Sequence, residues 1–364
     1  MRSPLLRWYR RHRRQLPWRR TTDPYAIWVA ETMLQQTRSE TVLGYYDRFL
    51  RRFPSLAALA RAPESAVLAR WSGLGYYARA RNLRRAARRV LALHGGRLPT
   101  APAELVELPG IGRYTAGAVA SIAFGVRVAA LDGNVARVLS RHFEIPGALR
   151  SPAVERRLWT VAEELVPRRS PGDWNQALME LGATLCRAKA PACSCCPLRK
   201  TCAANRNGRV DRFPEPSRRP HMRRVRRACV VLERGDRALL VRRDEGRLLR
   251  GLWEFPSREA PDGRPPRAVA REVASKIGAA HAPLRLEGKI EHTIMNRRIE
   301  TQVFVAQLAG RTPPRSASAR WFRWSDLAAL PLSAAGLRIA RLRGGPGDRL
   351  MGRRPTLRLA QVGA

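Results

Sequence analysis

The sequence has no run of about 18 uninterrupted apolar residues, the length that a membrane-spanning helix requires. Its first 20 residues are rich in arginine and hold no apolar stretch, so they do not resemble a secretory signal. No internal repeat is evident either. These absences exclude a membrane-embedded protein and a secreted one, and the cytoplasm is the expected compartment.

Acidic residues and lysine are both scarce. Against 29 Asp and Glu the chain holds 69 Lys and Arg, which gives a formal net charge of +40 at pH 7. Such an excess points to a polyanionic partner, above all nucleic acid. Almost all of the basic residues are arginines, and they are spread along the whole chain, so a genome-wide compositional bias is the alternative explanation. The four lysines are Lys189, Lys200, Lys276 and Lys289.

The chain is 364 residues long, more than one hydrophobic core usually organises, so two domains are predicted. Up to about residue 205, the apolar spacing and the turn residues predict consecutive short helices. Asp23 is expected to cap the first of them, with Pro24 in its first turn. The expected helices are 25–38, 40–52, 64–71, 76–94, 102–107, 113–124, 132–142, 152–166 and 173–186.

Residues 210–227 combine three prolines with many arginines, which is typical of a basic interdomain linker. After them, short apolar runs predict strands, with one helix near 265–277, and hence an α/β or α+β second domain. The strands are expected at 228–232, 238–241, 301–308 and 321–324. The resulting division is a mainly α domain over 1–209, the linker, an α/β domain over 228–340 and a basic tail over 341–364.

Five of the six cysteines lie close together, and four of them follow the spacing C-x6-C-x2-C-x5-C: Cys186, Cys193, Cys196 and Cys202. In a cytoplasmic chain such a cluster indicates metal binding rather than disulfides. Four thiolates can surround either a zinc ion or a [4Fe–4S] cluster, and the spacing alone does not separate the two. Cys195 lies off the pattern and is not expected to be a ligand. Cys229 is expected to be a small buried side chain.

A glycine-containing turn, Leu108-Pro109-Gly110-Ile111-Gly112, lies between two predicted helices. Gly110 and Gly112 permit a tight turn and leave backbone N–H groups free at the next helix's N-terminus, which suits a phosphate oxygen. Two carboxylates also stand in distinctive segments, Glu31 in Ala30-Glu31-Thr32-Met33-Leu34-Gln35-Gln36-Thr37 and Asp132 in Leu131-Asp132-Gly133-Asn134-Val135. Taken singly, the turn could be an ordinary connection, and each carboxylate a helix cap or half of a surface salt bridge.

Taken together, these segments resemble the adenine DNA glycosylase (MutY-type) family of the endonuclease III, or helix-hairpin-helix, superfamily, over roughly residues 5 to 340. Leu16-Pro17-Trp18 and Gly73-Leu74-Gly75-Tyr76-Tyr77-Ala78-Arg79-Ala80-Arg81-Asn82 strengthen the resemblance. It implies base excision repair by hydrolysis of the N-glycosidic bond of adenine opposite 8-oxoguanine or guanine in double-stranded DNA. It also implies a monomer associated with the nucleoid, and a [4Fe–4S] cluster on the four cysteines.

The resemblance assigns roles to individual residues. Glu31 would be the acid and base that acts on adenine N7 and on water, because a carboxyl in an apolar setting can have a raised pKa. Asp132 would stabilise the sugar cation, with Tyr114 and Asn134 in support. The residues expected at the DNA, as a wedge for the flipped base or as backbone contacts, are Gln36, Tyr76, Arg79, Gly110 and Gly112.

Lysine is missing where a strand-cleaving relative would need it. Superfamily members that form a Schiff base place a lysine two residues after the second hairpin glycine, and here that residue is Tyr114. No lysine precedes Lys189, so the helical domain offers no amine for an imine. The enzyme is therefore expected to be monofunctional and to leave an abasic site.

The C-terminal domain resembles the Nudix-like module that reads 8-oxoguanine, best marked by Gly251-Leu252-Trp253-Glu254-Phe255-Pro256. In the segment Arg271–Gly278, Ser275 and Lys276 stand where active Nudix hydrolases carry two glutamates. A lysine repels the divalent cation that such hydrolysis needs, so recognition without nucleotide hydrolysis is expected.

The family's lesion-reading loop, Phe-Ser-His after an upstream histidine, is altered in this chain. His292 is followed by Thr293-Ile294-Met295-Asn296. Ile294 is expected as the apolar wedge and Asn296 as the hydrogen-bonding residue, and the loss of Ser and His leaves the strength of lesion discrimination open. Two alternatives remain: a glycosylase for another mispair, such as thymine opposite guanine, and a DNA-binding protein without activity. The C-terminal domain and Glu31 count against the first, and the presence of both Glu31 and Asp132 counts against the second.

Overall fold

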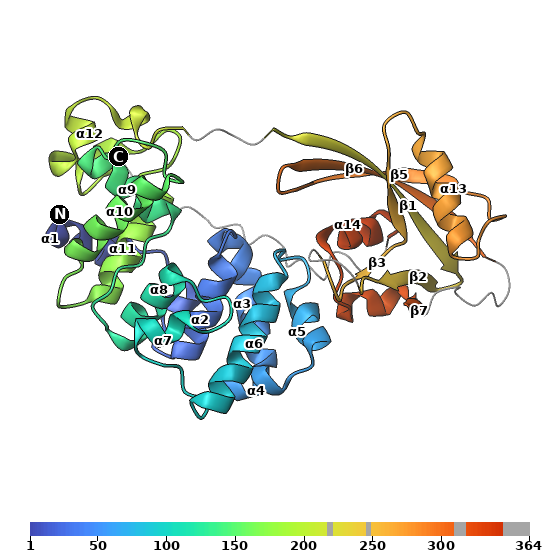
Figure 1. Cartoon of the computed structure of the whole chain (residues 1–364), viewed down its shortest axis with the longest axis horizontal. Helices are drawn as coiled ribbons and strands as arrows, with labels where there is room; N and C mark the ends of the chain where they lie inside the picture. The colour runs from blue at the N-terminus through green and yellow to red at the C-terminus, as the bar shows by residue number, and fades with distance from the viewer. Residues whose placement is uncertain (217–220, 245–248, 309–317, 345–364) are drawn as a thin grey trace. The chain divides into compact units, whose positions relative to one another are not determined.

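The computed structural model describes residues 1–216, 221–244, 249–308 and 318–344, which form two compact units. One comprises Met1–Arg61 with Asn82–Arg219, and the other Ala62–Arg81 with Pro220–Ala364 (Figure 1). The first unit is helical and the second is built on a mixed sheet, as the sequence predicts. The boundaries at residues 209 and 228 stay a prediction, but one segment of the predicted first domain, Ala62–Arg81, groups with the C-terminal residues.

Every helix that the sequence predicts in the first 205 residues is present, and most ends agree within two residues. The helices are α1 (Arg2–His12), α2 (Pro24–Leu34), α3 (Ser39–Arg52), α4 (Leu56–Arg61), α5 (Glu64–Trp71), α6 (Ala78–Leu93), α7 (Pro102–Val106), α8 (Arg113–Phe124), α9 (Gly133–Phe143), α10 (Pro152–Leu165), α11 (Pro171–Thr184) and α12 (Ala203–Arg206), with short 3-10 turns at Pro17–Arg19, Cys193–Cys195, Arg199–Thr201 and Val210–Arg212. The sequence analysis missed α1, α4 and the short α12.

Helix α2 begins as predicted and ends early. The Asp23 carboxylate accepts hydrogen bonds from the backbone N–H groups of Tyr25 and Ala26, and Pro24 fills the first turn. The helix ends at Leu34 rather than at residue 38, because Gln35 is extended and Gln36 adopts a φ of 56°. The early end places Gln36 on an exposed turn instead of on a helix face.

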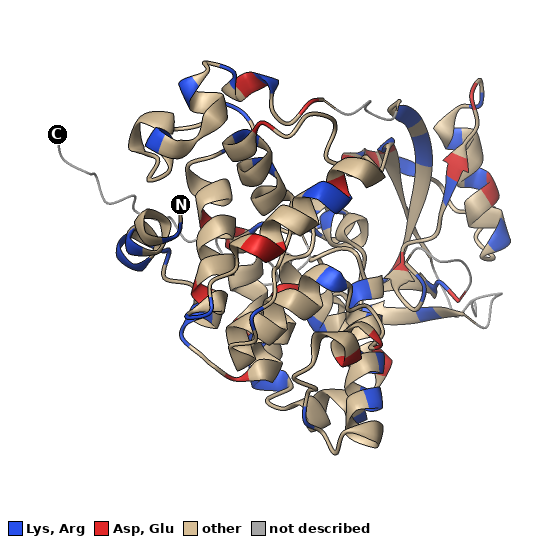
Figure 2. Cartoon of the chain, turned by 60° about the vertical axis from the view of Figure 1, so that its left-hand side comes forward, with Lys and Arg blue, Asp and Glu red and all other residues tan. Residues whose placement is uncertain are grey.

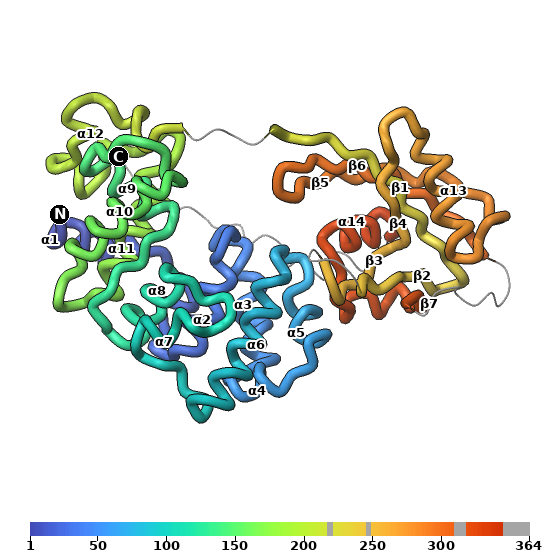
Figure 3. Tube along the Cα trace, in the orientation of Figure 1, coloured from blue at the N-terminus to red at the C-terminus, as the bar shows by residue number. Residues whose placement is uncertain are grey.

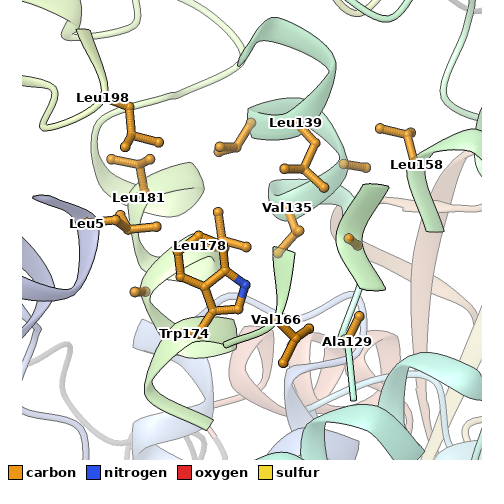
Figure 4. Packing of buried hydrophobic residues seen from close by; sticks show 14 of the residues in the cluster. Leu5, Ala129, Val135, Leu139, Leu158, Val166, Trp174, Leu178, Leu181 and Leu198 are labelled. Atoms are coloured by element: carbon orange, nitrogen blue, oxygen red, sulfur yellow. The ribbon is translucent and has the colours of Figure 1, made fainter. Parts of the chain in front are cut away.

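One hydrophobic core of the first unit is formed mainly by α1, α9, α10 and α11. Figure 4 shows Leu5 of α1 beside Leu178 and Leu181 of α11, and Val135 and Leu139 of α9 facing the same interior. Trp174 fills the space between these helices and is fully buried. The arginine-rich α1 escaped the sequence analysis because only Leu5 and Tyr9 mark its buried side.

Glu180, on α11, ties the N-terminal segment to this core. Its side chain is 1% exposed and accepts hydrogen bonds from Arg14 Nε (2.9 Å), Arg14 Nη2 (2.8 Å) and Arg19 Nη2 (2.8 Å). Burial by itself would raise the pKa of Glu180, but the two guanidinium groups lower it to about 2. The carboxylate therefore stabilises the folded state wherever it is ionised.

Replacing Glu180 by glutamine should lower the free energy of unfolding by about 3 kcal/mol at pH 7, because two partly buried arginines lose their counter-charge. The folded-state pKa lies below the unfolded one. The contribution is therefore complete above about pH 4.5 and disappears as the pH falls towards 2. Denaturant titration at pH 7 and pH 3 measures it. Glu40→Gln is the control, since Glu40 pairs with Arg14 at the exposed surface and should cost under about 1 kcal/mol. Equal losses in the two variants would contradict the argument.

The second unit contains a seven-stranded sheet with the order β3-β2-β1-β6-β5, in which β4 also pairs with β1 and β7 with β2. Strands β1 and β6 are parallel, and the other pairs are antiparallel. The strands are β1 (Arg223–Arg234), β2 (Arg237–Arg242), β3 (Trp253–Glu254), β4 (Ser257–Ala260), β5 (Arg285–Ile294), β6 (Arg297–Gln307) and β7 (Ala319–Arg323). The helices are α13 (Pro266–Lys276) and α14 (Ala334–Leu342), with a 3-10 turn at Trp324–Ala329.

Alternate residues of the central strands face opposite sides of the sheet. Val230 and Phe304 lie in the core beneath α13, whereas Val231 and Val303 lie in the core beneath α14. Figure 3 traces these two helices on either side of β1 and β6. The sheet is thus covered on both faces, which agrees with the predicted α/β class.

The element predictions for this unit need correction. The strand expected at 228–232 begins earlier, because β1 starts at Arg223, inside the predicted linker, and pairs with β6 along residues 297–307. The prediction was wrong because arginines alternate with the single buried Val225 in this part of the strand. Strand β5 was missed for the same reason, since charged side chains fill its exposed positions. The basic tail begins inside α14, and residues 345–364 lie outside the described part of the chain. No helix among the described residues could span a bilayer.

Candidate active site

Glu31 lies on α2, which is buried along most of its length. Its side chain is 5% exposed, and its Oε2 accepts a hydrogen bond of 2.6 Å from the hydroxyl of Tyr114 on α8. Burial is the largest influence on this carboxyl, and nearby Asp132 acts in the same direction, so that its pKa rises to about 7. At neutral pH the group is therefore divided between its acid and base forms, as a residue that both gives and takes a proton requires.

Asp132 caps the N-terminus of α9. Its Oδ1 accepts from the backbone N–H of Val135 (2.7 Å), and its Oδ2 from the side-chain amide of Asn134 (2.8 Å). Burial raises the pKa of Asp132, and these hydrogen bonds act against that rise. They favour the charged form, as does the helix N-terminus. The two neighbouring carboxyls therefore have different surroundings, one with a phenol as its donor and one with several amide donors.

Tyr114 interacts with both carboxyls. Burial, and then the neighbouring Glu31 and Asp132, raise the pKa of its phenol well above the usual value, so the hydroxyl stays protonated and donates to Glu31. The same oxygen lies 3.7 Å from the sulfur of Met179 on α11. The structure thus brings together all four predicted catalytic residues, Glu31, Tyr114, Asp132 and Asn134.

Arg137 belongs to the same network, and the sequence analysis missed it. Its Nη2 donates to Asn134 Oδ1 (2.9 Å) and to the carbonyl of Gly182 (2.7 Å), and its Nε donates to the carbonyl of Cys186 (2.8 Å). By occupying the amide oxygen of Asn134, Arg137 leaves the amide NH2 directed at Asp132. Arg137 stands three residues after Asn134, one helical turn along α9, and that spacing is the signal that could have revealed it.

Close approach of helices supports this arrangement. A Cβ added to Gly182 of α11 would lie 2.6 Å from the Cβ of Asn134, and one added to Gly117 of α8 would lie 2.0 Å from the carbonyl oxygen of Ala129. A larger residue at Gly117 would push α8, which carries Tyr114, away from the segment that leads to Asp132, and one at Gly182 would push α11 away from α9.

The predicted hairpin lies between α7 and α8. Gly110 is exposed, has a φ of 82°, and leaves no space for a Cβ, which would lie 2.6 Å from that of Asn82. Gly112 is exposed as well and forms the N-cap of α8. Its φ of −93° is ordinary, so the backbone strain of the turn falls on Gly110. The N-terminus of α8 is open to a phosphate in the way that the sequence predicts.

The two predicted wedge residues are exposed, each in its own unit. Gln36 has a φ of 56° and Tyr76 a φ of 49°, a region that residues with a side chain seldom adopt. The ring of Tyr76 is 54% exposed. The Arg79 guanidinium lies 5.3 Å from that ring and 5.4 Å from the ring of Trp71, and Arg79 itself is buried. Arg79 thus lies beneath Tyr76, where it can support the aromatic ring.

The four cysteines of the spacing motif line one cavity, together with Arg141 and His142. The pKa of Cys196 is raised to about 11, mainly by burial. The neighbouring Cys186, Cys202 and Cys193 raise it further. In the described part of the chain, no group of three or more His, Cys, Asp or Glu is arranged to hold a single metal ion. Four thiols that share one cavity suit either a zinc ion or an iron–sulfur cluster, since both accept four cysteine ligands.

The two other cysteines lie outside this cavity. Cys195 is exposed and does not line that cavity, and Cys229 is fully buried in the sheet. Arg141 Nη1 donates a hydrogen bond of 3.4 Å to the sulfur of Cys186.

The altered loop after His292 is the hairpin between β5 and β6. Met295 occupies the tip, with a φ of 54° and a side chain that is 77% exposed, whereas Ile294 is half-buried. The side-chain amide of Asn296 donates to the carbonyl of His221 at 3.4 Å. The pKa of His292 is lowered mainly by burial and, to a smaller extent, by the positive charges of Arg338 and Arg227. The sequence analysis missed Met295, which the change from a serine-containing loop could have signalled.

Basic residues occur throughout both units (Figure 2). They are concentrated at the start of β1, where Arg223, Arg224 and Arg226 are exposed. On α13, Lys276 lines a cavity of about 320 Å³ with Arg242, Arg243 and Arg258, while Glu272 is paired with Arg258 and Arg264. This cationic wall does not suit a divalent metal ion.

Both halves of the chain match known families. Residues 29–164 match the HhH-GPD superfamily base excision DNA repair protein, and residues 227–342 match the NUDIX domain. The chain is 37% identical to the adenine DNA glycosylase of Homo sapiens over 94% of this chain and 73% of that protein. It is also 37% identical to the adenine DNA glycosylase of Mus musculus, over 94% and 77%. A solved structure of a thermostable thymine-DNA glycosylase is 32% identical, with a TM-score of 0.51, and covers 56% of this chain and 94% of its own.

Proposed function

Because the chain belongs to the adenine DNA glycosylase family of base-excision repair enzymes, we propose that it hydrolyses the N-glycosidic bond of adenine opposite 8-oxoguanine or guanine. The substrate is a mispair in double-stranded DNA, the enzyme acts as a monomer at the nucleoid, and the product is an abasic site. The observation that carries the proposal is the buried Glu31–Tyr114 pair beside Asp132, with the pKa of Glu31 near 7.

The reaction needs one proton donor and one anion. Protonated Glu31 donates to N7 of the extruded adenine, so that the base departs as a neutral molecule when the bond to the sugar breaks. The positive charge left on the sugar is stabilised by Asp132, which Asn134 and the Val135 N–H hold in its charged form. Glu31, now a carboxylate, accepts a proton from water as the hydroxyl adds to the sugar carbon. The acid is thereby regenerated, and Tyr114 keeps it oriented.

Strand cleavage through an imine is not part of the proposed reaction. Tyr114 occupies the position at which strand-cleaving relatives carry lysine, and its phenol stays protonated. No lysine precedes Lys189. Borohydride should therefore trap no enzyme–DNA adduct at a rate comparable with base release, and efficient trapping would overturn this part of the proposal.

The test of the function is adenine release in a single turnover, with enzyme in excess over duplexes that carry adenine opposite 8-oxoguanine, guanine or thymine. Fast release opposite 8-oxoguanine and slower release opposite guanine supports a working lesion reader. Equal rates opposite 8-oxoguanine and guanine would mean that the hairpin with Met295 at its tip does not discriminate between these two bases. A duplex with thymine opposite guanine is included because of the 32% identical thymine-DNA glycosylase. Release of thymine alone would replace the proposal.

The family and the cysteine cavity support a [4Fe–4S] cluster held by Cys186, Cys193, Cys196 and Cys202. When bound, such a cluster fixes the loop that follows α11 and carries no role in the proton transfers above. Arg137 connects the two regions, since it donates hydrogen bonds to Asn134 and to the carbonyl of Cys186.

Purified protein should be brown, absorb near about 400 nm and contain about four irons per chain. Cys196→Ser should lose most of the colour and iron, because its sulfur lines the cavity. Cys195→Ser is the matched control one residue away and should keep both. Stoichiometric zinc without colour, or equal losses in the two variants, would contradict the assignment.

A further inference from the structure

The loop between α5 and α6 is held by the backbone N–H and carbonyl of one residue, Leu332, near the C-terminal end of the described chain. Ser72 Oγ donates to the carbonyl of Leu332 (2.8 Å), and the Leu332 N–H donates back to Ser72 Oγ (3.2 Å). The Tyr77 hydroxyl donates to the same carbonyl (2.7 Å) and accepts from the N–H of Gly73 (3.0 Å). All of these groups belong to the second unit, and Ser72, Tyr77 and Leu332 are buried.

The backbone of this loop between α5 and α6 is strained. Gly73 and Gly75 have φ values of 92° and 78°, and between them and α6 stands Tyr76 with a φ of 49°. Trp71 Nε1 and Arg79 Nη2 both donate to the carbonyl of Gly75, at 3.1 and 3.2 Å, and tighten the turn. Such a conformation persists only when the surroundings fix it at several points, and strain of this kind occurs at functional sites. In this loop, the strained conformation exposes the ring of Tyr76 to solvent.

Leu332 is itself fixed on both sides. The Trp253 N–H of β3 donates to the carbonyl of Pro331 (2.9 Å), and Leu332 forms a bridge with Trp253. The following residue, Ser333, caps α14 by accepting from the Gly336 N–H (3.0 Å). Near the other end of the loop, Arg81 donates to the carbonyl of Arg250 (2.8 Å). A rigid point of the C-terminal module therefore sets the position of a loop that lies more than 250 residues earlier in the chain.

We propose that the segment Pro331–Ser333 takes part in extruding the target base, by holding the Tyr76 loop in its strained form through Ser72 and Tyr77. The inference rests on the proposed function, in which an aromatic wedge fills the space that the base leaves. Ser72 and Tyr77 are positioning residues, since they act through Tyr76. The C-terminal module then assists extrusion of adenine from every mispair, in addition to any reading of the opposite base.

The first test is Tyr77→Phe in the full-length chain, which removes the hydroxyl and keeps the ring. Single-turnover release of adenine should slow about five- to tenfold, because the two hydrogen bonds of the Tyr77 hydroxyl are lost, and by the same factor opposite 8-oxoguanine and opposite guanine. Its pH dependence should stay that of the wild type. Tyr25→Phe is the matched control, because the Tyr25 hydroxyl is also buried and also donates to a backbone carbonyl, that of Phe53 (2.8 Å). It should release adenine at the wild-type rate.

The second measurement reports extrusion directly. With 2-aminopurine in place of the target adenine, fluorescence rises when the base leaves the stack, and an Asp132→Asn background prevents cleavage. Tyr76→Ala, Tyr77→Phe and Ser72→Ala should each lower the amplitude, and Tyr25→Phe should not. Thermal unfolding of each variant confirms that it is folded. A wild-type rate in Tyr77→Phe, or a reduced rate with unchanged extrusion, would overturn the inference. Absence of adenine release by the wild type would instead refute the proposed function.

Discussion

Replacing Glu31 by glutamine should slow single-turnover release of adenine by at least about a thousandfold, because one side chain supplies the proton for the base and later receives one from water. Glutamine keeps the size of the side chain and still accepts the hydrogen bond from Tyr114, so the loss isolates the proton. The measurement uses enzyme in excess over a duplex with adenine opposite 8-oxoguanine. A loss below about tenfold would show that another group protonates the base.

The pH dependence of the wild type should report the same group. Release needs protonated Glu31, whose pKa is about 7, so the rate should be level at lower pH and fall about tenfold per unit above that value. A rate that rises through pH 7 would mean that Glu31 acts first as a base.

Glu31→Gln should also stabilise the protein. The pKa of the Glu31 carboxyl is about 7 in the folded protein and 4.5 in the unfolded chain. The free energy of unfolding of the wild type therefore decreases as the pH rises from 4.5 to 7. Above pH 7 the wild type should be less stable than the variant by about 2–3 kcal/mol, a figure that allows for the cost of burying the glutamine amide. The variant escapes this cost, and its midpoint in denaturant should exceed that of the wild type at pH 8 and match it at pH 4.5. Equal stability at pH 8 would mean that Glu31 is ionised there without penalty.

Local patterns made much of the fold predictable. The helices with clear apolar spacing, such as α8, were placed residue by residue, and the strands β2 and β7 were located by short apolar runs. The arginine-rich α1 and β5 were missed because a few buried residues among many charges give a weak periodicity. The carboxylates of the candidate site lie in motifs that are continuous in the sequence, so Glu31 and Asp132 could be named in advance.

Contacts between distant segments could not be predicted in this way. Arg14 and Arg19 gave no sign of their pairing with Glu180, about 160 residues later. Likewise, nothing in the sequence around Ser72 indicates that Leu332 holds it. Both depend on packing that the chain acquires only when folded, and in each case a buried polar group finds a partner that no periodicity encodes.

Asp132→Asn should reduce base release about a thousandfold or more while leaving the fold intact, because the negative charge that stabilises the sugar cation is removed. Asparagine is as good a helix N-cap as aspartate, so the hydrogen bond from Val135 to the cap can persist. The amide does meet the NH2 of Asn134 on its other side, which costs one hydrogen bond of 2.8 Å. The measurement combines single-turnover rates with DNA affinity and extrusion of 2-aminopurine, both of which should stay near the wild type.

Asp23→Asn makes the same chemical change at another helix start and serves as the control. Asp23 caps α2 through the N–H groups of Tyr25 and Ala26, so a general effect of losing a capping charge would appear there too. Its release rate should stay within about twofold of the wild type, since only a charge at the reacting sugar enters the barrier. If Asp132→Asn lost DNA binding together with activity, or if both variants lost rate equally, Asp132 would be a structural cap. Glu31 would then have to act without an anionic partner.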